Sequence, residues 1–276
     1  MDKISVIVTA RNAEKTIHST IRSLLLSIAK HDEVLILLDA CTDNTGAVVN
    51  SFSDSRLKVF ENTTGLGRSR GRNFLIDKSD STFIAICDAD DISLPWRFTF
   101  SRKLLEKFDA VFGTAIVFGK TLKPLPVIPQ IPRKITCEQM PIELLGRNPL
   151  VHSTATFKRS LVDEVGYYRE SEAEEYDLWL RMINAGNLLY RSARPVTLYR
   201  FHPDQASKSP GFVRRGLECP FVIQEQKTLS ESLGIVGESI QEIREISRER
   251  IKKNGFRARL EVQGLPDFLR NSSNGS

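Results

Sequence analysis

The sequence predicts an α/β protein: a mixed, mainly parallel β-sheet flanked by helices, with a helical C-terminal extension. In the first half of the chain, short β-branched runs alternate with longer amphipathic segments, which is the pattern of βαβ units. Polar segments directly follow three of the strand-like runs, as is typical of the ligand edge of an open α/β sheet. After about residue 210 there is no strand-like run, and the spacing of apolar residues is helical.

The first half is expected to hold four strands with helices between them. Residues 4–8 form an uninterrupted apolar run, typical of a strand that is buried on both faces. A helix is predicted over residues 13–29, where apolar side chains recur at helical spacing. The elements that follow are a strand over 34–38, a helix that opens near Asp43 with Thr42 or Asp43 as its cap, a short strand over 57–60, a segment over 65–77 that leads into a third helix, and a strand over 83–87.

The second half changes character at residues 120–134, where a run of prolines predicts an extended surface loop. The elements expected after it are a helix over 137–145, a strand over 151–157, a helix over 173–185, strands over 188–191 and 196–201, and helices over 221–233 and 239–253. We therefore divide the chain into an α/β domain over residues 1–208, a helical extension over 209–270 and a disordered tail over 271–276.

The composition indicates a soluble globular protein. With 276 residues, 41% of them hydrophobic and 26% charged, the chain can form one large domain, with or without a smaller appendage. No segment approaches the roughly eighteen apolar residues of a membrane span, and the first strand follows without a signal peptide's apolar stretch. The four cysteines show no Cys-x-x-Cys spacing, so neither a zinc knuckle nor a disulfide framework is indicated. We expect a cytoplasmic protein with free thiols.

The net charge of +5 predicts an anionic partner, whether a nucleotide, a phospholipid surface or a nucleic acid. Nucleic acid is the weakest of the three, because the chain has no recognised nucleic-acid-binding motif and no basic stripe interleaved with aromatic residues. Basic residues concentrate in two segments, 68–72 and 244–259. We therefore expect no nucleic-acid partner.

The segment Asp88-Ala89-Asp90-Asp91 places three carboxylates directly after an apolar run. Neighbouring carboxylates raise one another's pKa values, so they resist joint ionisation unless a cation lies among them. Enzymes that handle nucleotide diphosphates hold Mg²⁺ or Mn²⁺ with one or two carboxylates and leave the other positions to water and phosphate. The cluster therefore predicts a divalent metal site. The alternative is a solvated acidic turn that caps the helix beginning near Pro95. Within the metal-site interpretation too, Asp91 is expected to cap that helix, where its charge suits the helix dipole.

Three separate segments should meet at this acidic cluster. Thr9-Ala10-Arg11-Asn12 follows the first strand, Asp39 follows the second, and the acidic cluster follows the fourth. In open α/β sheets, ligands bind beyond the carboxyl ends of the strands. We therefore expect these segments to line one cleft.

Taken together, these motifs resemble those of family 2 glycosyltransferases of the GT-A fold. The blocks occur in that family's order: Ser5-Val6-Ile7-Val8-Thr9-Ala10-Arg11-Asn12, Leu38-Asp39-Ala40-Cys41-Thr42-Asp43-Asn44-Thr45, Gly65-Leu66-Gly67 with Arg72-Asn73, Asp88-Ala89-Asp90-Asp91, Glu174-Glu175-Tyr176-Asp177-Leu178-Trp179-Leu180-Arg181, and Tyr199-Arg200-Phe201-His202 with Gln205 and Ser207. The resemblance covers about residues 3–208. It implies a Rossmann-like nucleotide-diphospho-sugar transferase domain that moves a sugar, with inversion, from a nucleotide diphosphate donor with the help of Mn²⁺ or Mg²⁺.

The resemblance also implies residues that bind the nucleotide. Asp39 corresponds to the family's base-binding aspartate, although it could simply shape the following turn. Two departures bear on these contacts: the family's usual Pro-Thr-Tyr-Asn is Thr9-Ala10-Arg11-Asn12, and its Asp-Asp-Gly-Ser is Leu38-Asp39-Ala40-Cys41. The full implied set is Thr9, Ala10, Arg11, Asp39, Arg72, Asp88 and Ala89. Arg68 and Arg72 lie on the same helical face and could both merely be solvated, but a nucleotide role is preferred for Arg72 only.

The metal and the reaction are assigned in the same way. Asp90 is the expected metal ligand, Asp88 contacts the ribose or the metal, and His202 is a further candidate ligand that could instead be structural. Glu174 and Glu175 correspond to the family's Glu-Asp pair, whose second position is the usual base, because an acceptor hydroxyl must lose its proton to a carboxylate within reach. Their alternative role is ordinary helix N-terminal chemistry.

Four other features are expected to be structural or to have one of two roles. His152 is expected to hydrogen-bond locally, and Asp177 and Trp179 are expected to be structural or to line the acceptor cleft. The basic helix over 239–253 carries several isoleucines, so it could lie on an anionic membrane surface or pack against the α/β domain; packing is the preferred interpretation.

We expect a donor that is a UDP-sugar and an acceptor that is a glycan or a lipid-linked glycan in bacterial surface polysaccharide synthesis. Two alternatives stay open. A nucleotidyltransferase should carry a glycine- and lysine-rich phosphate loop, which residues 10–14 do not offer. A nucleotide-sugar-binding protein without activity is compatible with glutamate in place of aspartate at Glu175.

Overall fold

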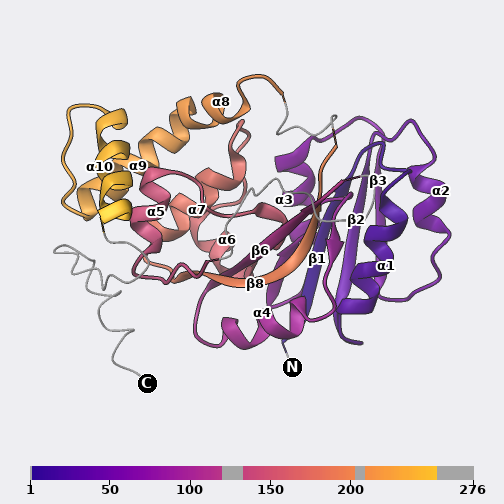
Figure 1. The fold of residues 1–276 in the computed structure, drawn as a ribbon. Helices are drawn as coiled ribbons and strands as arrows, with labels where there is room; N and C mark the ends of the chain where they lie inside the picture. The colour runs from indigo at the N-terminus through magenta and orange to yellow at the C-terminus, as the bar shows by residue number, and fades with distance from the viewer. Residues whose placement is uncertain (1, 120–132, 203–208, 254–276) are drawn as a thin grey trace.

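The computed structural model describes residues 2–119, 133–202 and 209–253 (Figure 1). Its centre is an eight-stranded mixed sheet in the order β3-β2-β1-β4-β7-β6-β8-β5. The strands are β1 Ile4–Ala10, β2 Glu33–Asp39, β3 Leu57–Asn62, β4 Phe83–Ile86, β5 Ile92–Ser93, β6 Ala110–Phe118, β7 Thr156–Lys158 and β8 Leu189–Arg200. The first four strands are parallel, as are β6 and β8, whereas β5 and β7 run antiparallel to their neighbours. The predicted mixed, mainly parallel sheet is confirmed.

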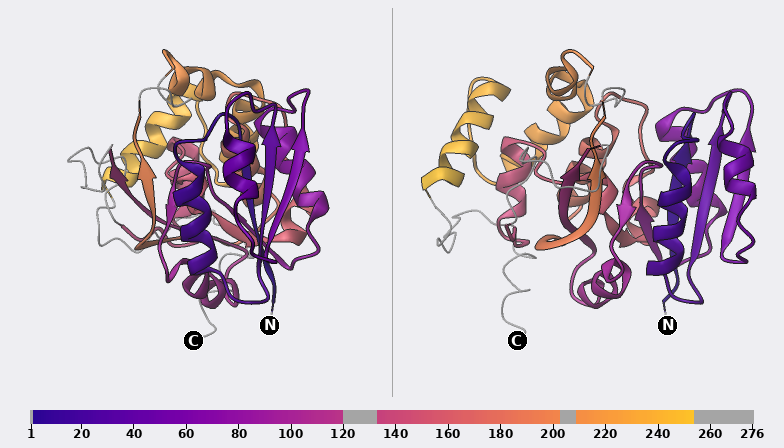
Figure 2. Two further views of the ribbon diagram at one scale, coloured as in Figure 1. Left: turned by 90° about the vertical axis from the view of Figure 1, so that its right-hand side faces the viewer. Right: turned by 45° about the vertical axis from the view of Figure 1, so that its right-hand side comes forward.

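Helices cover both faces of the sheet (Figure 2). They are α1 Ile17–Ser27, α2 Thr45–Asn50, α3 Arg68–Lys78, α4 Arg97–Leu105, α5 Met140–Gly146, α6 Arg159–Val165, α7 Glu174–Asn184, α8 Phe212–Glu218, α9 Pro220–Ser232 and α10 Ile240–Lys253. Alternate side chains of a strand point to opposite faces, so Val6 and Val8 pack with α1, whereas Ile7 packs with α3 and belongs to the same core as α7. Because both faces are buried, β1 and β2 are apolar almost throughout, as predicted.

Several elements differ from those expected from the sequence. No strand was expected at β6, where Gly113 interrupts the apolar run; a Cβ there would lie 2.3 Å from Val196 Cγ2 of β8. The two late strands are one continuous strand, β8, which passes Pro195 at an irregularity in its register with β6. The expected strand over 151–157 is a 3₁₀ turn, His152–Thr154, followed by the short β7. Helices α6 and α8 were not predicted.

The C-terminal helices pack against the second half of the sheet domain. In Figure 1 they lie with α5 and α7, at the end of the molecule away from β3. Ile240 and Ile243 of α10 are buried in the same core as α7, and Ile246 and Ile251 pack against it. The apolar face of α10 therefore packs against the rest of the protein, which was the preferred interpretation. Across the described residues, no helix has the length and apolar character needed to cross a membrane.

The proposed boundary at residue 208 borders residues 203–208, which lie outside the described residues. The same holds for the tail over 271–276 and for most of the proline-rich loop. The division into two domains stays a prediction.

Candidate functional site

The segments expected to share a cleft lie at one edge of the sheet. Strands β2, β1 and β4 are neighbours and parallel, so the residues that follow them, Asp39, Arg11 and the acidic cluster, emerge at the same edge. Thr9 is half-buried and Ala10 fully buried at the end of β1, whereas Arg11 is exposed. Gly71 of α3 faces this edge, and a Cβ there would lie 3.1 Å from Thr9 Cγ2. Its lack of a side chain lets α3 approach the sheet closely.

Asp39 holds the loop that precedes α3 through hydrogen bonds. Its two carboxylate oxygens accept hydrogen bonds from the backbone N–H groups of Leu66, at 2.6 Å, and Gly67, at 2.9 Å. These bonds shape the loop before α3 and not the turn that directly follows Asp39, so the turn-shaping alternative also stays a prediction. Each carboxylate oxygen has a second lone pair, so the expected contact with a nucleotide base stays a prediction.

Two non-glycine residues adopt left-handed backbone conformations beside this edge: Asn12, with φ of 51°, and Ala40, with φ of 53°. The Asn12 side chain anchors its turn by accepting a hydrogen bond from the backbone N–H of Thr42, at 2.8 Å. Ala40 has no such side-chain bond, and its Cβ makes the conformation unfavourable. The sequence feature that points to this conformation is the glycine that usually stands at the position of Ala40 in the family that the chain resembles.

Replacing Ala40 by glycine is therefore expected to raise the free energy of unfolding by about 0.5–1 kcal/mol, because relief of left-handed strain exceeds the added chain entropy. Urea unfolding followed by circular dichroism measures the change. Ala110→Gly in β6, at a position without a positive φ, is the control and should lose about 1 kcal/mol. An Ala40→Gly variant less stable than the wild type contradicts the strain argument.

Asp90 and His202 come together from segments far apart in the sequence. His202 Nε2 lies 2.9 Å from Asp90 Oδ2, and both side chains are partly exposed. Within the described ranges, no group of three or more His, Cys, Asp or Glu side chains is arranged to hold a metal ion. A carboxylate nevertheless fits Mn²⁺ or Mg²⁺ in a site completed by water and donor phosphate oxygens, whereas an imidazole suits Mn²⁺ better than Mg²⁺. The structure thus brings two of the predicted metal ligands together, and their role as ligands stays a prediction.

Asp91 has a different role from the predicted helix cap. Helix α4 begins at Arg97, and no side chain caps it, because the chain first forms β5 along β8. Asp91 is fully buried, and its Oδ1 accepts a hydrogen bond from the backbone N–H of Arg200, at 2.9 Å. The Arg200 side chain returns a bond from Nε to the Asp90 carbonyl, at 2.8 Å. These two bonds join the acidic loop to the strand end that carries His202.

A buried arginine lies under the acidic loop. Arg97 is fully buried, and its Nη2 donates to the carbonyls of Ile86, at 2.6 Å, and Ala155, at 3.3 Å. Burial raises the pKa of Asp91 well above its ordinary value, and the charges of Asp88 and Asp90 raise it further. The positive charge of Arg97 acts on Asp91 in the opposite sense. Sequence reasoning missed Arg97, since nothing local marks it as buried.

Asp88 and Ala89 are held at the end of β4. Burial raises the pKa of Asp88 to about 6, while Arg72, whose Nη2 lies 3.9 Å from Asp88 Oδ1, lowers it. The Ala89 carbonyl accepts hydrogen bonds from the hydroxyls of Thr16, at 3.0 Å, and Thr20, at 3.1 Å. The loop backbone is thereby tied to α1.

The two glutamates at the start of α7 differ sharply. Glu174 is buried and receives Arg72 Nη1 at 2.9 Å and Arg68 Nε at 3.1 Å, both at Oε1. Glu175 is half-buried, and no ion pair to it occurs within the described part of the chain. Burial, then the charge of Glu174, raises the pKa of Glu175 to about 7. Glu175 is therefore poised to accept a proton near neutral pH, whereas Glu174 is occupied.

The Arg68 side chain is 43% exposed, in line with a solvated residue, but it also forms an ion pair with Glu174. Arg68 and Arg72, one turn apart on α3, both reach Glu174, so the face they share is an ion-pair face. The i, i+4 spacing of the two arginines was the feature of the sequence that could have indicated this shared contact. Arg72 is buried and lies between Glu174 and Asp88, while its predicted contact with the nucleotide stays untested.

The remaining polar candidates have structural partners. His152 Nε2 lies 2.9 Å from the Tyr168 hydroxyl, as the local hydrogen-bonding interpretation predicted. Asp177 is buried and paired with Arg181 at 3.0 Å. Trp179 is buried in the core, edge-on to Phe112. The structural interpretation of Asp177 and Trp179 fits these contacts.

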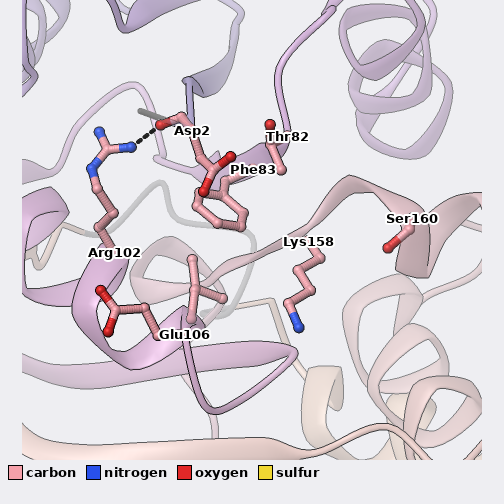
Figure 3. A pocket seen from close by; sticks show the side chains of 8 residues that line it. Asp2, Thr82, Phe83, Arg102, Glu106, Lys158 and Ser160 are labelled. Carbon is pink, nitrogen blue, oxygen red and sulfur yellow. Dashed lines mark hydrogen bonds between the residues drawn. The ribbon is translucent and has the colours of Figure 1, made fainter.

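A pocket lies away from this site (Figure 3). It is lined by Thr82 and Phe83 at the start of β4, Lys158 of β7, and Arg102 and Glu106 at the end of α4, among others. The acidic cluster follows the opposite end of β4, so the pocket is at the other edge of the sheet. None of the predicted site residues lines it.

Comparisons with known proteins agree with this architecture. The model of glycosyl transferase family 2 matches residues 5–166. The chain is 25% identical over 207 residues to the UDP-Glc:alpha-D-GlcNAc-diphosphoundecaprenol beta-1,3-glucosyltransferase WfaP of Escherichia coli, covering 75% of this chain and 80% of that protein. It is 27% identical over 226 residues to the putative glycosyltransferase EpsE of Bacillus subtilis (strain 168), covering 77% and 76% respectively.

Among solved structures, S. aureus TarS 1-349 in complex with UDP-GlcNAc matches with a TM-score of 0.64, covering 94% of this chain and 74% of that chain at 18% identity. At this identity the match shows a shared fold. The family model, in contrast, spans more than half of the sequence. The chain therefore belongs to glycosyl transferase family 2 and is a glycosyltransferase of the GT-A fold.

Proposed function

We propose that this glycosyltransferase transfers a sugar, with inversion, from a UDP-sugar to a hydroxyl of a lipid-linked glycan during synthesis of a bacterial surface polysaccharide. The observation that carries the proposal is the arrangement of two neighbouring acidic sites. Glu175 is half-buried and free of ion pairs among the described residues, and Asp90 lies beside His202. Arg72 connects the two regions, because it contacts both Glu174 and Asp88. The relative WfaP, named for UDP-Glc and a diphosphoundecaprenol-linked acceptor, supports the choice of donor and acceptor class.

Proton transfer and binding of the diphosphate are proposed to occur at two separate groups of residues. The Glu175 carboxylate takes the proton of the acceptor hydroxyl as that oxygen bonds to the anomeric carbon and the bond from this carbon to the UDP oxygen breaks. Asp90 and His202 would hold a divalent cation, which when bound supplies positive charge to the departing diphosphate. Thr9, Ala10, Arg11, Asp39, Arg72, Asp88 and Ala89 form the proposed nucleotide site.

We place the protein in the cytoplasm, at the inner face of the cell membrane, because a lipid-linked acceptor and a soluble nucleotide sugar meet there. Family membership contradicts the nucleotidyltransferase alternative. The inactive sugar-nucleotide-binding alternative is weakened by Glu175, whose raised pKa suits a base.

Incubating the protein with GlcNAc-diphosphoundecaprenol and a panel of UDP-sugars, with and without Mn²⁺, tests the proposal. We expect Mn²⁺-stimulated addition of one sugar, detected by mass spectrometry of the lipid. GDP-sugars serve as the control for recognition of the donor's nucleobase. Transfer from GDP-sugars alone, or equal transfer in the presence of EDTA, contradicts the assigned donor or metal.

The turnover number should depend on pH through Glu175. Only the carboxylate accepts a proton, and the pKa of this group is raised from 4.5 to about 7. We therefore expect kcat to rise about tenfold per pH unit below about pH 7 and to level off above it. Rates at saturating donor and acceptor across this range measure the profile. A kcat that stays constant between about pH 5.5 and about pH 8 contradicts Glu175 as the base.

A further inference from the structure

Glu174 and Arg68 have no role in the reaction as outlined, yet they form the most heavily charged contact beside the base. Glu174 is almost fully buried, with a side chain 1% exposed, and it accepts bonds from two guanidinium groups. A buried carboxylate without partners is strongly unfavourable, and two cations more than balance one anion. Arg72 also faces the Asp88 carboxylate, with 3.9 Å between its Nη2 and Asp88 Oδ1.

We propose that Arg68 and Glu174 are positioning residues: with Arg72 they lock the first turn of α7 onto α3, so that Glu175 alone faces the acceptor hydroxyl at a fixed distance from the donor. This inference rests on the proposed role of Glu175. It adds two residues that act through their neighbours and contact no reacting atom.

Other contacts show that α3 is built to hold the segment leading into α7. Ser69 Oγ donates to the Arg169 carbonyl at 3.0 Å, and Asn73 exchanges two hydrogen bonds with the Tyr168 backbone. Both contacts precede α7. Within its first turn, the Tyr176 hydroxyl donates to the Leu144 carbonyl and Asp177 pairs with Arg169. The bonds of Arg68 and Arg72 to Glu174 are the ones that join this turn to α3.

The same geometry predicts opposite electrostatic effects of the two residues on Glu175. The charged and titratable groups that face Glu175 are Glu174 on its own helix, Arg68 and Arg72 on α3, and Tyr168 before α7. The charge of Glu174 raises the pKa of Glu175, and the charge of Arg68 lowers it. Removing each charge should therefore move the pH profile in opposite directions.

Arg70 offers a matched control. It lies between Arg68 and Arg72 on the same helix, but it pairs with Glu170 at the surface, where both side chains are more than half exposed. An exposed pair contributes little to stability or geometry. Arg70→Met should therefore leave activity and the pH profile as in the wild type.

Arg68→Met, Arg70→Met and Glu174→Gln should be compared for kcat, for donor affinity by calorimetry and for the pH profile. We expect Arg68→Met to lower kcat about tenfold to a hundredfold with an unchanged donor dissociation constant, because misplacement of a reacting group by about 1 Å has effects of this size. Its pH profile should move to higher pH, and that of Glu174→Gln to lower pH. Arg68 is partly exposed, so the first variant should fold; Arg68→Lys, which keeps the charge, should recover part of the rate.

Two results would overturn the inference. If Arg68→Met behaves like Arg70→Met, the ion pair has no positioning role. If Arg68→Met weakens donor binding with kcat unchanged, Arg68 is a donor ligand. Failure of the proposed function looks different, because the wild type would then show no transfer, or Glu175→Gln would retain it.

Discussion

Replacing Glu175 by glutamine is expected to lower kcat by about 10²- to 10⁴-fold while donor affinity stays near the wild-type value. Glutamine has almost the same shape but cannot take the proton of the acceptor hydroxyl. No ion pair of Glu175 is lost, because none was found for it in the described part of the chain. Turnover measured at saturating substrates, together with calorimetric titration of donor, separates the two quantities.

Stability provides an independent check on the same variant. The pKa of Glu175 is raised on folding from 4.5 to about 7, so folding favours the protonated form and the wild type loses stability as pH rises through this window. Glutamine stays neutral, so Glu175→Gln should melt at a higher temperature than the wild type above about pH 7 and at a similar one below about pH 4.5. If turnover of Glu175→Gln is unchanged, a residue other than Glu175 is the base. If the variant melts at a lower temperature than the wild type at high pH, the raised pKa of Glu175 is contradicted.

Replacing Asp90 by asparagine should remove the Mn²⁺-dependent part of donor affinity. The amide keeps the shape and a carbonyl oxygen but loses the negative charge, which is the main attraction for a hard divalent cation. We expect donor binding in Mn²⁺ to weaken by at least about a hundredfold, towards its value in EDTA. Calorimetric titration of UDP in Mn²⁺ and in EDTA measures both values.

The control for Asp90 is Asp109→Asn, which changes a partly buried carboxylate that pairs with Lys158 near the opposite edge of the sheet. It should keep the full difference between Mn²⁺ and EDTA. His202→Asn should lose part of the difference, because His202 shares the site with Asp90. If Asp90→Asn keeps its Mn²⁺ stimulation, the assignment of the acidic loop to the metal site is contradicted.

The parallel core strands were readable from the sequence, because burial on both faces requires apolar residues in succession. The runs over β1, β2 and β4 were therefore found to within two residues at either end. Strand β6 was missed although it is central, because its Gly113 is required by the close approach of Val196, which is distant in the sequence. The role of Asp91 was wrong for a related reason, since its partner is the backbone of Arg200.

By itself, the sequence determined the class of fold, the edge of the sheet that carries the acidic loop, and the residue types suited to a metal and a base. These follow from local periodicity and from chemistry written in adjacent residues. Only the tertiary structure decided which of two neighbouring glutamates is free and which is held by Arg68 and Arg72. That distinction depends on the approach of α3 to α7, two helices about a hundred residues apart, and on burial that makes each unpaired charge costly.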